Sequence, residues 1–242
     1  MEKSKIRSSL SSLFLLLLIG LSIRSFVFEP FHIPSSSMKS TLLEGDYIFA
    51  SKYAYGYSKH SFPFALNIFN GRIFYTPPQR GDIIVFKPVH NTNIRFVKRV
   101  IGMPGDKVQM IDGDLFLNGE KVPRKESGSF LDYESNRSIP RYIETLPNSK
   151  KHEILIDSSV HKFSYNTSVY HVPNNQFFVM GDNRNNSIDS RFPEVSFIPM
   201  ENIIGRVSIV GLSFKLKKVD WLPFNFRLPV SLRLNRIFRQ VS

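Results

Sequence analysis

The sequence predicts a mainly β domain that follows one N-terminal transmembrane helix. Three observations support this prediction: an uncharged apolar stretch near the N-terminus, short apolar runs bounded by Gly, Pro and Asn turns in the rest of the chain, and no long pattern with a helical period after residue 30. The chain has 242 residues, of which 42% are hydrophobic and 21% are charged. This length and composition are enough for a sizeable core and exclude a disordered polyelectrolyte.

Residues 8–28 are predicted to form a transmembrane anchor. The first part, residues 8–23, carries no charge, and extension to residue 28 gives 21 residues, close to the roughly 20 that cross a bilayer as a helix. Arg24 lies near the end of this stretch, where its long side chain can reach the headgroups. The helix is expected to stop at Glu29-Pro30, because the residue before a proline avoids the α region.

A cleaved signal peptide is the alternative to an anchor. Basic residues before the apolar stretch fit both, but the nearby small-x-small cleavage site, residues 20–22, lies inside the apolar run. We therefore favour the anchor. The positive charges within residues 1–7 place that end in the cytoplasm and the rest of the chain on the other side of a membrane that is crossed once.

The body after the anchor is predicted to consist of short strands separated by turns. Asn118-Gly119 between two apolar runs is a strong hairpin signal. Residues 57–79, rich in aromatic residues and proline, are expected to form a long surface loop or ribbon, and the polar residues 123–172 a less regular subdomain. Strands are predicted at residues 46–50, 82–86, 94–101, 108–111, 115–117, 120–122, 176–180 and 205–210.

These patterns divide the chain into five parts. No internal repeat is found, so none of the parts is expected to copy another. The parts are a cytoplasmic N-terminus (1–7), the transmembrane anchor (8–28), a β domain of two segments (29–110 and 176–213), an inserted hairpin and irregular subdomain (111–175), and a basic amphipathic tail (214–242).

The net charge of +12, from 32 Lys and Arg against 20 Asp and Glu, suggests an anionic partner. Residues 1–24 carry four basic residues and one acid, and residues 214–242 carry seven and one, so most of the excess lies in the two terminal segments. Because one segment borders the predicted membrane helix and the other is amphipathic, an anionic phospholipid membrane is favoured over nucleic acid. A helix or strand that packs on the body is the alternative for the tail, and residues 62–69 could also contact lipid or pack inward.

Composition restricts the chemistry that the chain can perform. The absence of cysteine excludes a disulfide scaffold, a thiolate zinc site, an iron–sulfur cluster and a cysteine nucleophile. The six histidines are scattered without metal-ligand spacing, and no G-x-S-x-G motif is present, although a Ser-His-Asp triad stays an alternative. We therefore predict no metal and no cofactor, and we expect any nucleophile to be a serine.

Lys98 is expected on the apolar face of a predicted strand. Because side chains alternate along a strand, Lys98 shares its face with Phe96 and Val100, while Arg95 and Arg99 point the other way. Burial among apolar side chains disfavours the ammonium and lowers the pKa of lysine, so that the neutral amine can act as a general base and activate a serine hydroxyl. The alternative is a lysine whose stem packs on an edge strand and whose amine reaches water.

Two polar segments are candidates for the rest of a site. Residues 33–38, IPSSSM, place three serines after a proline just behind the anchor. Residues 181–191, GDNRNNSIDSR, form a segment rich in hydrogen-bonding side chains. On composition alone the first is a plain loop and the second an ordinary polar turn.

The order of these motifs resembles the type I signal peptidases, membrane-bound Ser–Lys proteases that remove signal peptides. IPSSSM (33–38) is followed by residues 96–106 (FVKRVIGMPGD) and then by residues 181–191, and the resemblance covers roughly residues 8–212. It implies a mainly β fold, with an antiparallel β catalytic domain and an inserted smaller β subdomain. It also implies cleavage of signal-peptide-bearing preproteins after small-x-small, Ala-x-Ala-like sites, at the external or periplasmic face of the bacterial inner (plasma) membrane.

The resemblance implies a role for each matching residue. Ser37 is the expected nucleophile and Lys98 its general base. The Ser35 hydroxyl and the Ser37 backbone N–H form the expected oxyanion hole. Ser187 is expected to hydrogen-bond and orient the lysine amine.

Other matching residues are expected to support the site or to bind substrate. Asp189 and Arg191 pair and brace their loop. Ser36 stands where the family often has glycine and Ser40 where it often has proline, and both departures concern rate or specificity more than the class of reaction. The residues expected to flank an extended substrate are Phe31, Ile33, Pro34, Phe96 and Val97.

Two other classes of protein would explain part of the sequence. A non-catalytic, membrane-anchored cationic binding protein accounts for the anchor and the charge, but it leaves Ser37, Lys98 and Ser187 unexplained. A self-cleaving Ser–Lys regulator would need a soluble DNA-binding segment where this chain has an apolar stretch.

Overall fold

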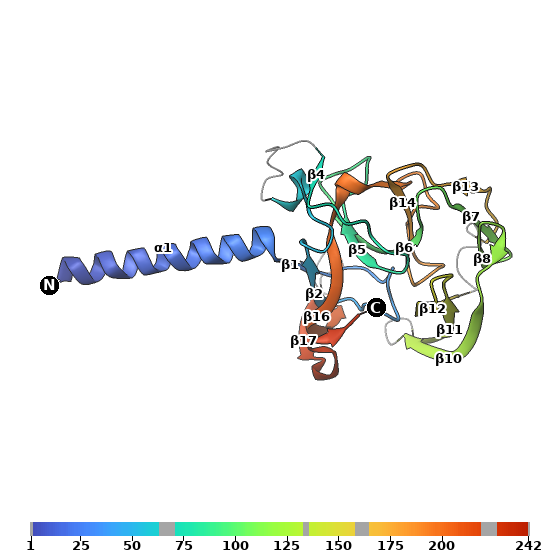
Figure 1. Cartoon of the computed structure of the whole chain (residues 1–242). Helices are drawn as coiled ribbons and strands as arrows, with labels where there is room; N and C mark the ends of the chain where they lie inside the picture. Colours follow the sequence, from blue (N-terminus) through green and yellow to red (C-terminus); the bar gives the residue numbers. More distant parts are fainter. Residues whose placement is uncertain (1, 63–70, 133–135, 158–164, 219–226, 242) are drawn as a thin grey trace.

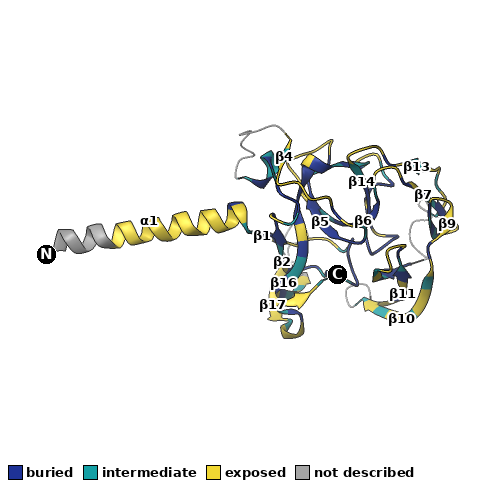
Figure 2. Ribbon diagram, viewed as in Figure 1, coloured by how far each residue is buried: buried dark blue, intermediate teal, exposed yellow. Residues whose placement is uncertain are grey.

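The computed structural model describes residues 2–62, 71–132, 136–157, 165–218 and 227–241. Helix α1 (Glu2–Phe26) extends from one side of a body built from β-strands (Figure 1). Within α1, Ser9–Phe26 is long and apolar enough to cross a membrane, and nearly all of it is exposed (Figure 2). The mainly β class with antiparallel strands that the sequence predicts is confirmed.

The junction between α1 and the body is short and heavily bonded. Strand β1 (Phe28–His32) begins after Val27 alone, so the helix ends at Phe26 and not at the predicted residue 28. Pro30 lies inside β1 and does not stop the helix; β1 is an edge strand, where a proline is tolerated. The backbone N–H of Lys52 donates to the Val27 carbonyl, and the buried Lys52 ammonium pairs with Glu29 at 2.8 Å.

The largest sheet carries the candidate site and is antiparallel. Its register places Ile84 opposite Lys98. The strands predicted at 46–50, 82–86, 94–101 and 176–180 are confirmed to within two residues, whereas the strand predicted at 205–210 is much longer. The strands run in the order β1, β2 (Asp46–Ser51), β16 (Ile203–Lys218), β5 (Ile83–Phe86), β6 (Phe96–Gly102), β14 (Gln176–Met180) and β15 (Ile198–Pro199), and β17 (Arg227–Leu232) and β18 (Arg239–Gln240) also pair with β16.

A four-stranded sheet contains the predicted hairpin. It consists of β13 (Tyr170–His171), β7 (Lys107–Ile111), β8 (Asp114–Leu117) and β9 (Glu120–Lys121). The turn at Asn118-Gly119 is confirmed, with φ angles of 54° and 86° that suit a tight hairpin turn. The predicted domain border at residue 111 falls on the last residue of β7, so it separates this strand from its partner β8.

A three-stranded sheet corrects the expectation of a less regular subdomain at residues 123–172. Strands β10 (Arg124–Asp132), β11 (Arg137–Thr145) and β12 (Lys151–Leu155) pair in sequence order. Most positions of β10 are exposed or half-buried, without a regular alternation. The sequence therefore lacks the apolar period of two that marks a half-buried strand.

The region expected to be a loop or ribbon is a ribbon in its described part. Strands β3 (Tyr57–Ser58) and β4 (Arg72–Ile73) pair with each other. Residues 63–70, which contain most of the segment 62–69 considered for lipid contact, lie outside the described residues. The described residues also contain short 3₁₀ helices at η1 (Lys59–Ser61), η4 (Met200–Asn202) and η5 (Leu234–Arg236).

The described part of the tail is built from strands and packs on the body. Strand β16 continues past residue 213 to Lys218, and β17 and β18 return along it, so the predicted border at 214 cuts a strand. Arg236 is buried and pairs with Asp46 at 2.6 Å, and Arg227 pairs with Glu44. Two of the cations counted toward a lipid surface therefore neutralise acids of the body. Residues 219–226, with Trp221, lie outside the described residues.

Strand β6 lies between two apolar clusters, and this packing fixes where its side chains point. One cluster contains Phe31, Ile33, Met38 and Leu42, with Val97 packed against it. The other contains Ile84, Phe86 and Val100, with Phe96 packed against it. Alternate side chains of β6 thus face different clusters, as the period of two predicts, and Lys98 shares the side of Phe96 and Val100.

Candidate active site

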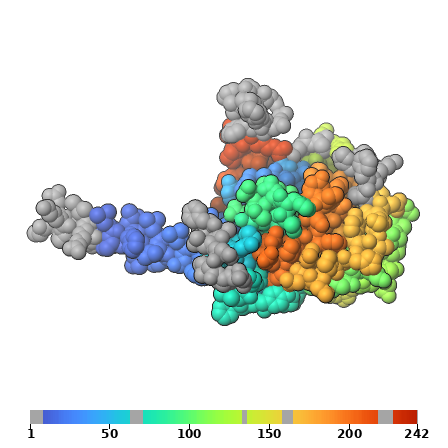
Figure 3. Space-filling view, turned by 90° about the horizontal axis from the view of Figure 1, so that it is seen from above, coloured from blue at the N-terminus to red at the C-terminus, as the bar shows by residue number. Residues whose placement is uncertain are grey.

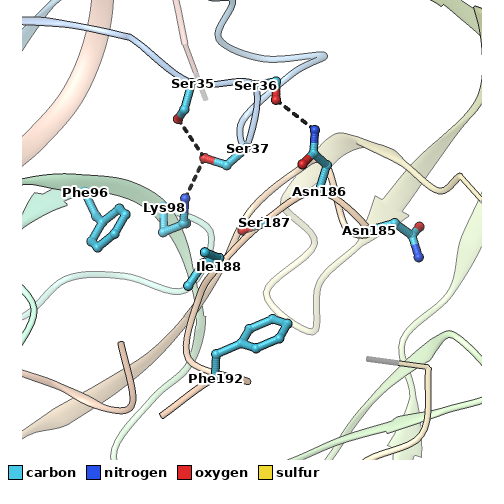
Figure 4. A pocket seen from close by; sticks show the side chains of 10 residues that line it. All are labelled: Ser35, Ser36, Ser37, Phe96, Lys98, Asn185, Asn186, Ser187, Ile188 and Phe192. Carbon is cyan, nitrogen blue, oxygen red and sulfur yellow. Dashed lines mark hydrogen bonds between the residues drawn. The ribbon is translucent and has the colours of Figure 1, made fainter. Parts of the chain in front are cut away.

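Ser37 and Lys98, the two residues expected to react, are in direct contact. The Lys98 Nζ atom donates a hydrogen bond of 2.5 Å to the Ser37 Oγ atom (Figure 4). Lys98 belongs to β6, and Ser37 belongs to the turn that follows β1. The exposed fraction is 1% for Lys98 and 9% for Ser37, so the contact is shielded from water.

The turn that carries Ser37 is held on two sides. On one side, Met38 and Leu42 are buried in the apolar cluster, and the N–H of Leu42 donates to the Met38 carbonyl at 2.8 Å. On the other side, the backbone N–H of Asn183 donates to the Ser37 carbonyl at 3.0 Å. The position of the Ser37 hydroxyl is therefore fixed both by the core and by the loop 181–191.

The surroundings of Lys98 favour the neutral amine. Burial lowers the pKa of Lys98 from 10.5 to about 8, against the opposing effect of the carboxylates of Asp189 and Asp182. At that pKa about a tenth of the molecules hold a neutral amine at pH 7. The Phe96 ring centre lies 5.4 Å from the Nζ atom, and Ile84 is the cross-strand neighbour.

Ser35 lies beside Ser37. Its hydroxyl oxygen is 3.4 Å from the Ser37 hydroxyl oxygen, and the residue is exposed. Within the described part of the chain, no group accepts a hydrogen bond from the backbone N–H of Ser37. A hydroxyl and an N–H group are thus both available close to the Ser37 Oγ atom.

The loop 181–191 places Ser187 differently from the expected arrangement. The Ser187 hydroxyl donates to Asp189 at 2.8 Å, and among the described residues the Lys98 amine is bonded to Ser37 and not to Ser187. The expectation that Ser187 hydrogen-bonds the lysine amine is therefore not met in this structure. Ser187 still lines the same pocket as Lys98 (Figure 4).

Asp189 organises the loop. It is fully buried and accepts hydrogen bonds from Ser187, from the backbone N–H of Gly181 at 2.9 Å and from the Arg191 Nε atom at 2.8 Å. Burial alone would raise the pKa of Asp189, but Arg191 and the hydrogen bonds hold it below the usual value. The carboxylate is therefore charged and fully partnered, and the predicted pairing with Arg191 is present.

Gly181 occupies a position that admits no side chain. A Cβ atom built there would overlap the Ser187 side chain and the Ser37 carbonyl oxygen. The close approach of the loop to the turn that carries Ser37 thus depends on a glycine. The sequence shows this glycine but not its neighbours, because the contact joins residues far apart in the chain.

A pocket of about 450 Å³ surrounds the Ser37–Lys98 contact. Of the five residues expected to flank a substrate, Phe96 lines it, whereas Phe31 and Ile33 are buried in the core, Val97 packs on the same cluster and Pro34 is exposed. Sequence reasoning missed half of the lining, because it comes from loops without a regular apolar pattern. The lining residues are Ser35, Ser36, Ser37, Phe96, Lys98, Asn185, Asn186, Ser187, Ile188 and Phe192.

The chain segments that precede Ser37 and Lys98 approach each other beside this pocket. The Arg95 guanidinium carbon lies 5.5 Å from the centre of the Phe31 ring. Phe31 belongs to β1 and Arg95 immediately precedes β6, so the chain segments before Ser37 and before Lys98 lie close together. No acidic or histidine side chain lines the pocket itself, and among the described residues no His, Asp and Glu side chains gather in a way that could hold a metal ion.

Two buried ion pairs behind the site were also missed. Arg99, on the opposite face of β6 from Lys98, donates to both carboxylate oxygens of Asp182, at 2.9 and 2.8 Å. Arg184 pairs with Glu144 of β11. The backbone N–H of Arg184 donates to the Leu155 carbonyl and the N–H of Leu155 donates to the Asp182 carbonyl, which joins the loop to β12. Burial would raise the pKa of Glu144, but Arg184 holds it below the usual value. These contacts attach the loop 181–191 to the main sheet and to the inserted sheet.

The chain is similar to known proteins over most of its length. The family profile described as "Signal peptidase, peptidase S26" matches residues 6–212. Signal peptidase I of Rickettsia bellii (strain OSU 85-389) is 41% identical over 244 residues, which are 95% of this chain and 84% of that protein. Signal peptidase I of Rickettsia felis is 40% identical, with 92% of this chain and 88% of that protein covered. A crystal structure of a signal peptidase I from Enterococcus faecalis V583 has 28% identity and a TM-score of 0.32, covering 54% of this chain and 97% of that one.

Proposed function

The chain belongs to the signal peptidase I family, serine endopeptidases that remove signal peptides from preproteins, and we propose that Ser37 and Lys98 perform this reaction. The observation that carries the proposal is the 2.5 Å hydrogen bond between a buried lysine amine and a serine hydroxyl in a pocket without a histidine. The lowered pKa of Lys98 supports it, because a base must be neutral to accept a proton.

The proposed reaction has two halves. The neutral Lys98 amine takes the Ser37 hydroxyl proton while the Oγ atom attacks the scissile carbonyl carbon. The resulting ammonium gives this proton to the leaving nitrogen as the C–N bond breaks, which releases the mature protein and leaves an acyl ester on Ser37. Water then attacks the ester in the same manner, and Lys98 returns the proton to Ser37.

The oxyanion of each tetrahedral intermediate needs donors close to the Ser37 Oγ atom. We propose the Ser35 hydroxyl and the Ser37 N–H for this role, since both lie beside the nucleophile and the N–H has no other partner among the described residues. Ser187 binds Asp189, so its proposed role is to hold the loop against the nucleophile turn and not to bind the amine. Asp189 and Arg191 brace that loop as a buried pair.

The proposed substrate is an extended segment with small side chains before the cleaved bond, of the Ala-x-Ala type. Strand β1 is the edge of the largest sheet, and an exposed edge can pair with an extended peptide. The segments 31–34 and 95–97 lie close together, and we propose that such a peptide passes beside them to reach Ser37. Signal-peptide-bearing preproteins are thus the proposed partners, and no cofactor takes part in the steps.

The proposed location is the bacterial inner (plasma) membrane, with the N-terminus in the cytoplasm and the catalytic domain on the external or periplasmic side. Helix α1 stands clear of the body (Figure 3) and is long and apolar enough to cross. Strands β2, β16 and β17 lie on the side of the body from which α1 leaves (Figure 1). On that side the exposed Leu228, Val230 and Leu232 of β17 support the proposed contact of the tail with anionic phospholipid.

Cleavage of a preprotein by the full chain in phospholipid vesicles tests the catalytic proposal. Ser37→Ala and Lys98→Ala should abolish cleavage, and Lys98→Arg should also fail because arginine stays charged. Ser168→Ala and Lys107→Ala, at exposed positions outside the pocket, are the matched controls and should cleave normally. Normal cleavage by Ser37→Ala would show that another group is the nucleophile, and normal cleavage by Lys98→Ala would show that another group is the base.

The cysteine-free chain allows two clean tests of the membrane proposals. In intact cells an impermeant maleimide should label Lys107→Cys but reach Ser4→Cys only after lysis; the reverse pattern would contradict the proposed orientation. Trp221 is the single tryptophan. Brominated anionic lipid should quench its fluorescence in vesicles, and unquenched fluorescence would refute the contact of the tail with lipid.

A further inference from the structure

Among the described residues, Ser36 and Ser37 are joined to the loop 181–191 by three hydrogen bonds, one of which needs a hydroxyl at position 36. Asn183 donates from its backbone N–H to the Ser37 carbonyl at 3.0 Å and from its side chain to the Ser36 carbonyl at 3.1 Å. Both bonds end on the backbone, so they do not depend on which residue stands at position 36. The third bond runs from the Asn186 Nδ2 atom to the Ser36 Oγ atom at 2.9 Å and requires a hydroxyl there.

The Ser36–Asn186 bond lies in the wall of the pocket. Both residues line the pocket, Asn186 is exposed and Ser36 is half-buried, so a bound peptide can touch them. Figure 4 shows this bond on the far side of Ser37 from Phe96. The pocket therefore has two ends, with Phe96 at one, Ser36 and Asn186 at the other, and the Ser37–Lys98 contact between them.

The path of the substrate decides what meets each end, and here the inference rests on the proposed function. Under the proposed function the residues before the cleaved bond pass beside residues 31–34 and 96–97, which is the end of the pocket that Phe96 marks. An extended chain advances about 3.3 Å per residue, so the residue after the cleaved bond lies one step beyond Ser37, toward Asn186.

We propose that the hydrogen-bonded pair of Ser36 and Asn186 is a specificity-determining wall for the first residue of the mature protein, which admits small side chains there and disfavours large apolar ones. A large apolar side chain would have to separate the pair and leave a hydroxyl and an amide without their partner. The net value of one hydrogen bond corresponds to a discrimination of roughly three- to tenfold. A glycine at position 36 has no hydroxyl and cannot form this wall.

The test compares substrates that differ only in the residue after the cleaved bond. Peptides that carry one signal sequence followed by Ala, Ser, Leu or Phe are cleaved by the full chain in detergent, and the ratio of kcat/KM for Leu to that for Ala is measured. Ser36→Gly and Asn186→Ala should each raise this ratio by roughly three- to tenfold, and the double variant should raise it no further, because both remove the same bond. Ser36→Thr keeps the hydroxyl and should keep the low ratio.

The controls separate this proposal from a merely structural role and from the proposed function. Asn174→Ala, at an exposed position outside the pocket, should leave the ratio unchanged. If Ser36→Gly lowers kcat equally for all four peptides and leaves the Leu-to-Ala ratio of kcat/KM unchanged, the specificity proposal is overturned. Cleavage by the wild-type chain would still support the catalytic proposal. If the wild-type chain cleaves none of the peptides, the catalytic proposal fails first.

Discussion

The rate of cleavage should follow the titration of Lys98, and pH is the perturbation that tests this. The fall of the Lys98 pKa from 10.5 to about 8, caused by burial, corresponds to about 3 kcal/mol against the charged amine. At pH 7 it raises the neutral fraction from about one in 3,000 to about one in ten, a gain of about 300-fold in active base. Between pH 6 and pH 9 the neutral fraction rises from about 1% to about 90%.

The assay is kcat/KM for a soluble signal-peptide substrate without titrating side chains, because kcat/KM reports the pKa values of the free enzyme. We expect kcat/KM to rise about 90-fold from pH 6 to pH 9, to be half-maximal near pH 8 and to level off above it. Ser35→Ala, which removes a proposed oxyanion donor, should lower the whole curve by about 10²–10³-fold without moving its midpoint. A tenfold rise per pH unit that continued through pH 9.5 would show that Lys98 is not desolvated and would refute the reasoning.

Three further outcomes follow from the packing of the site. Gly181→Ala should reduce cleavage at least tenfold, because the new methyl group displaces Ser187 and the nucleophile turn; unchanged kcat would contradict the close approach. Asp189→Asn should lower the free energy of unfolding by about 3–5 kcal/mol, since it leaves Arg191 buried without a counter-charge, and thermal unfolding in detergent measures this. Lys98→Met should abolish cleavage but stabilise the fold by up to about 3 kcal/mol at pH 7, because the buried lysine binds its proton less well than in the unfolded chain. This gain should shrink as pH rises from about 8 toward 10.5, and a gain independent of pH would point to packing alone.

The sequence contains the local part of the site but not the part made by distant contacts. The period of two along β6 was enough to predict that Lys98 is buried. The ordered motifs placed Ser37 and Lys98 in one candidate site, and the structure shows the two side chains in contact. The Arg99–Asp182 pair joins residues 83 positions apart, and no pattern in a single sequence marks such a pairing. Ser187 illustrates a finer limit. Its hydroxyl was expected to bond the Lys98 amine, and only the folded geometry shows that it bonds Asp189.

In the fold, too, some elements could be predicted from local sequence and others could not. The hairpin at Asn118-Gly119 was predictable because its turn needs positive φ angles that these residues adopt. Strand β10 was not, because its positions are all exposed or half-buried and lack the alternation that reveals a strand. The helix end was misplaced because the start of β1, and not Pro30, terminates α1.

The junction between α1 and the body has a mechanical consequence. With Val27 alone between helix and strand, and with Lys52 bonded to both Val27 and Glu29, the junction contains no slack segment that could act as a hinge. Ser37 lies eleven positions after Phe26, and Phe28–His32 between them are fixed in β1. If α1 crosses the membrane as proposed, the height of Ser37 above the bilayer is set by the geometry of one strand, at most about 35–40 Å for a fully extended chain and less as folded. Under the proposed function a bond would then be cut only where the substrate holds it at the level of Ser37, and a tilt of α1 would change that level.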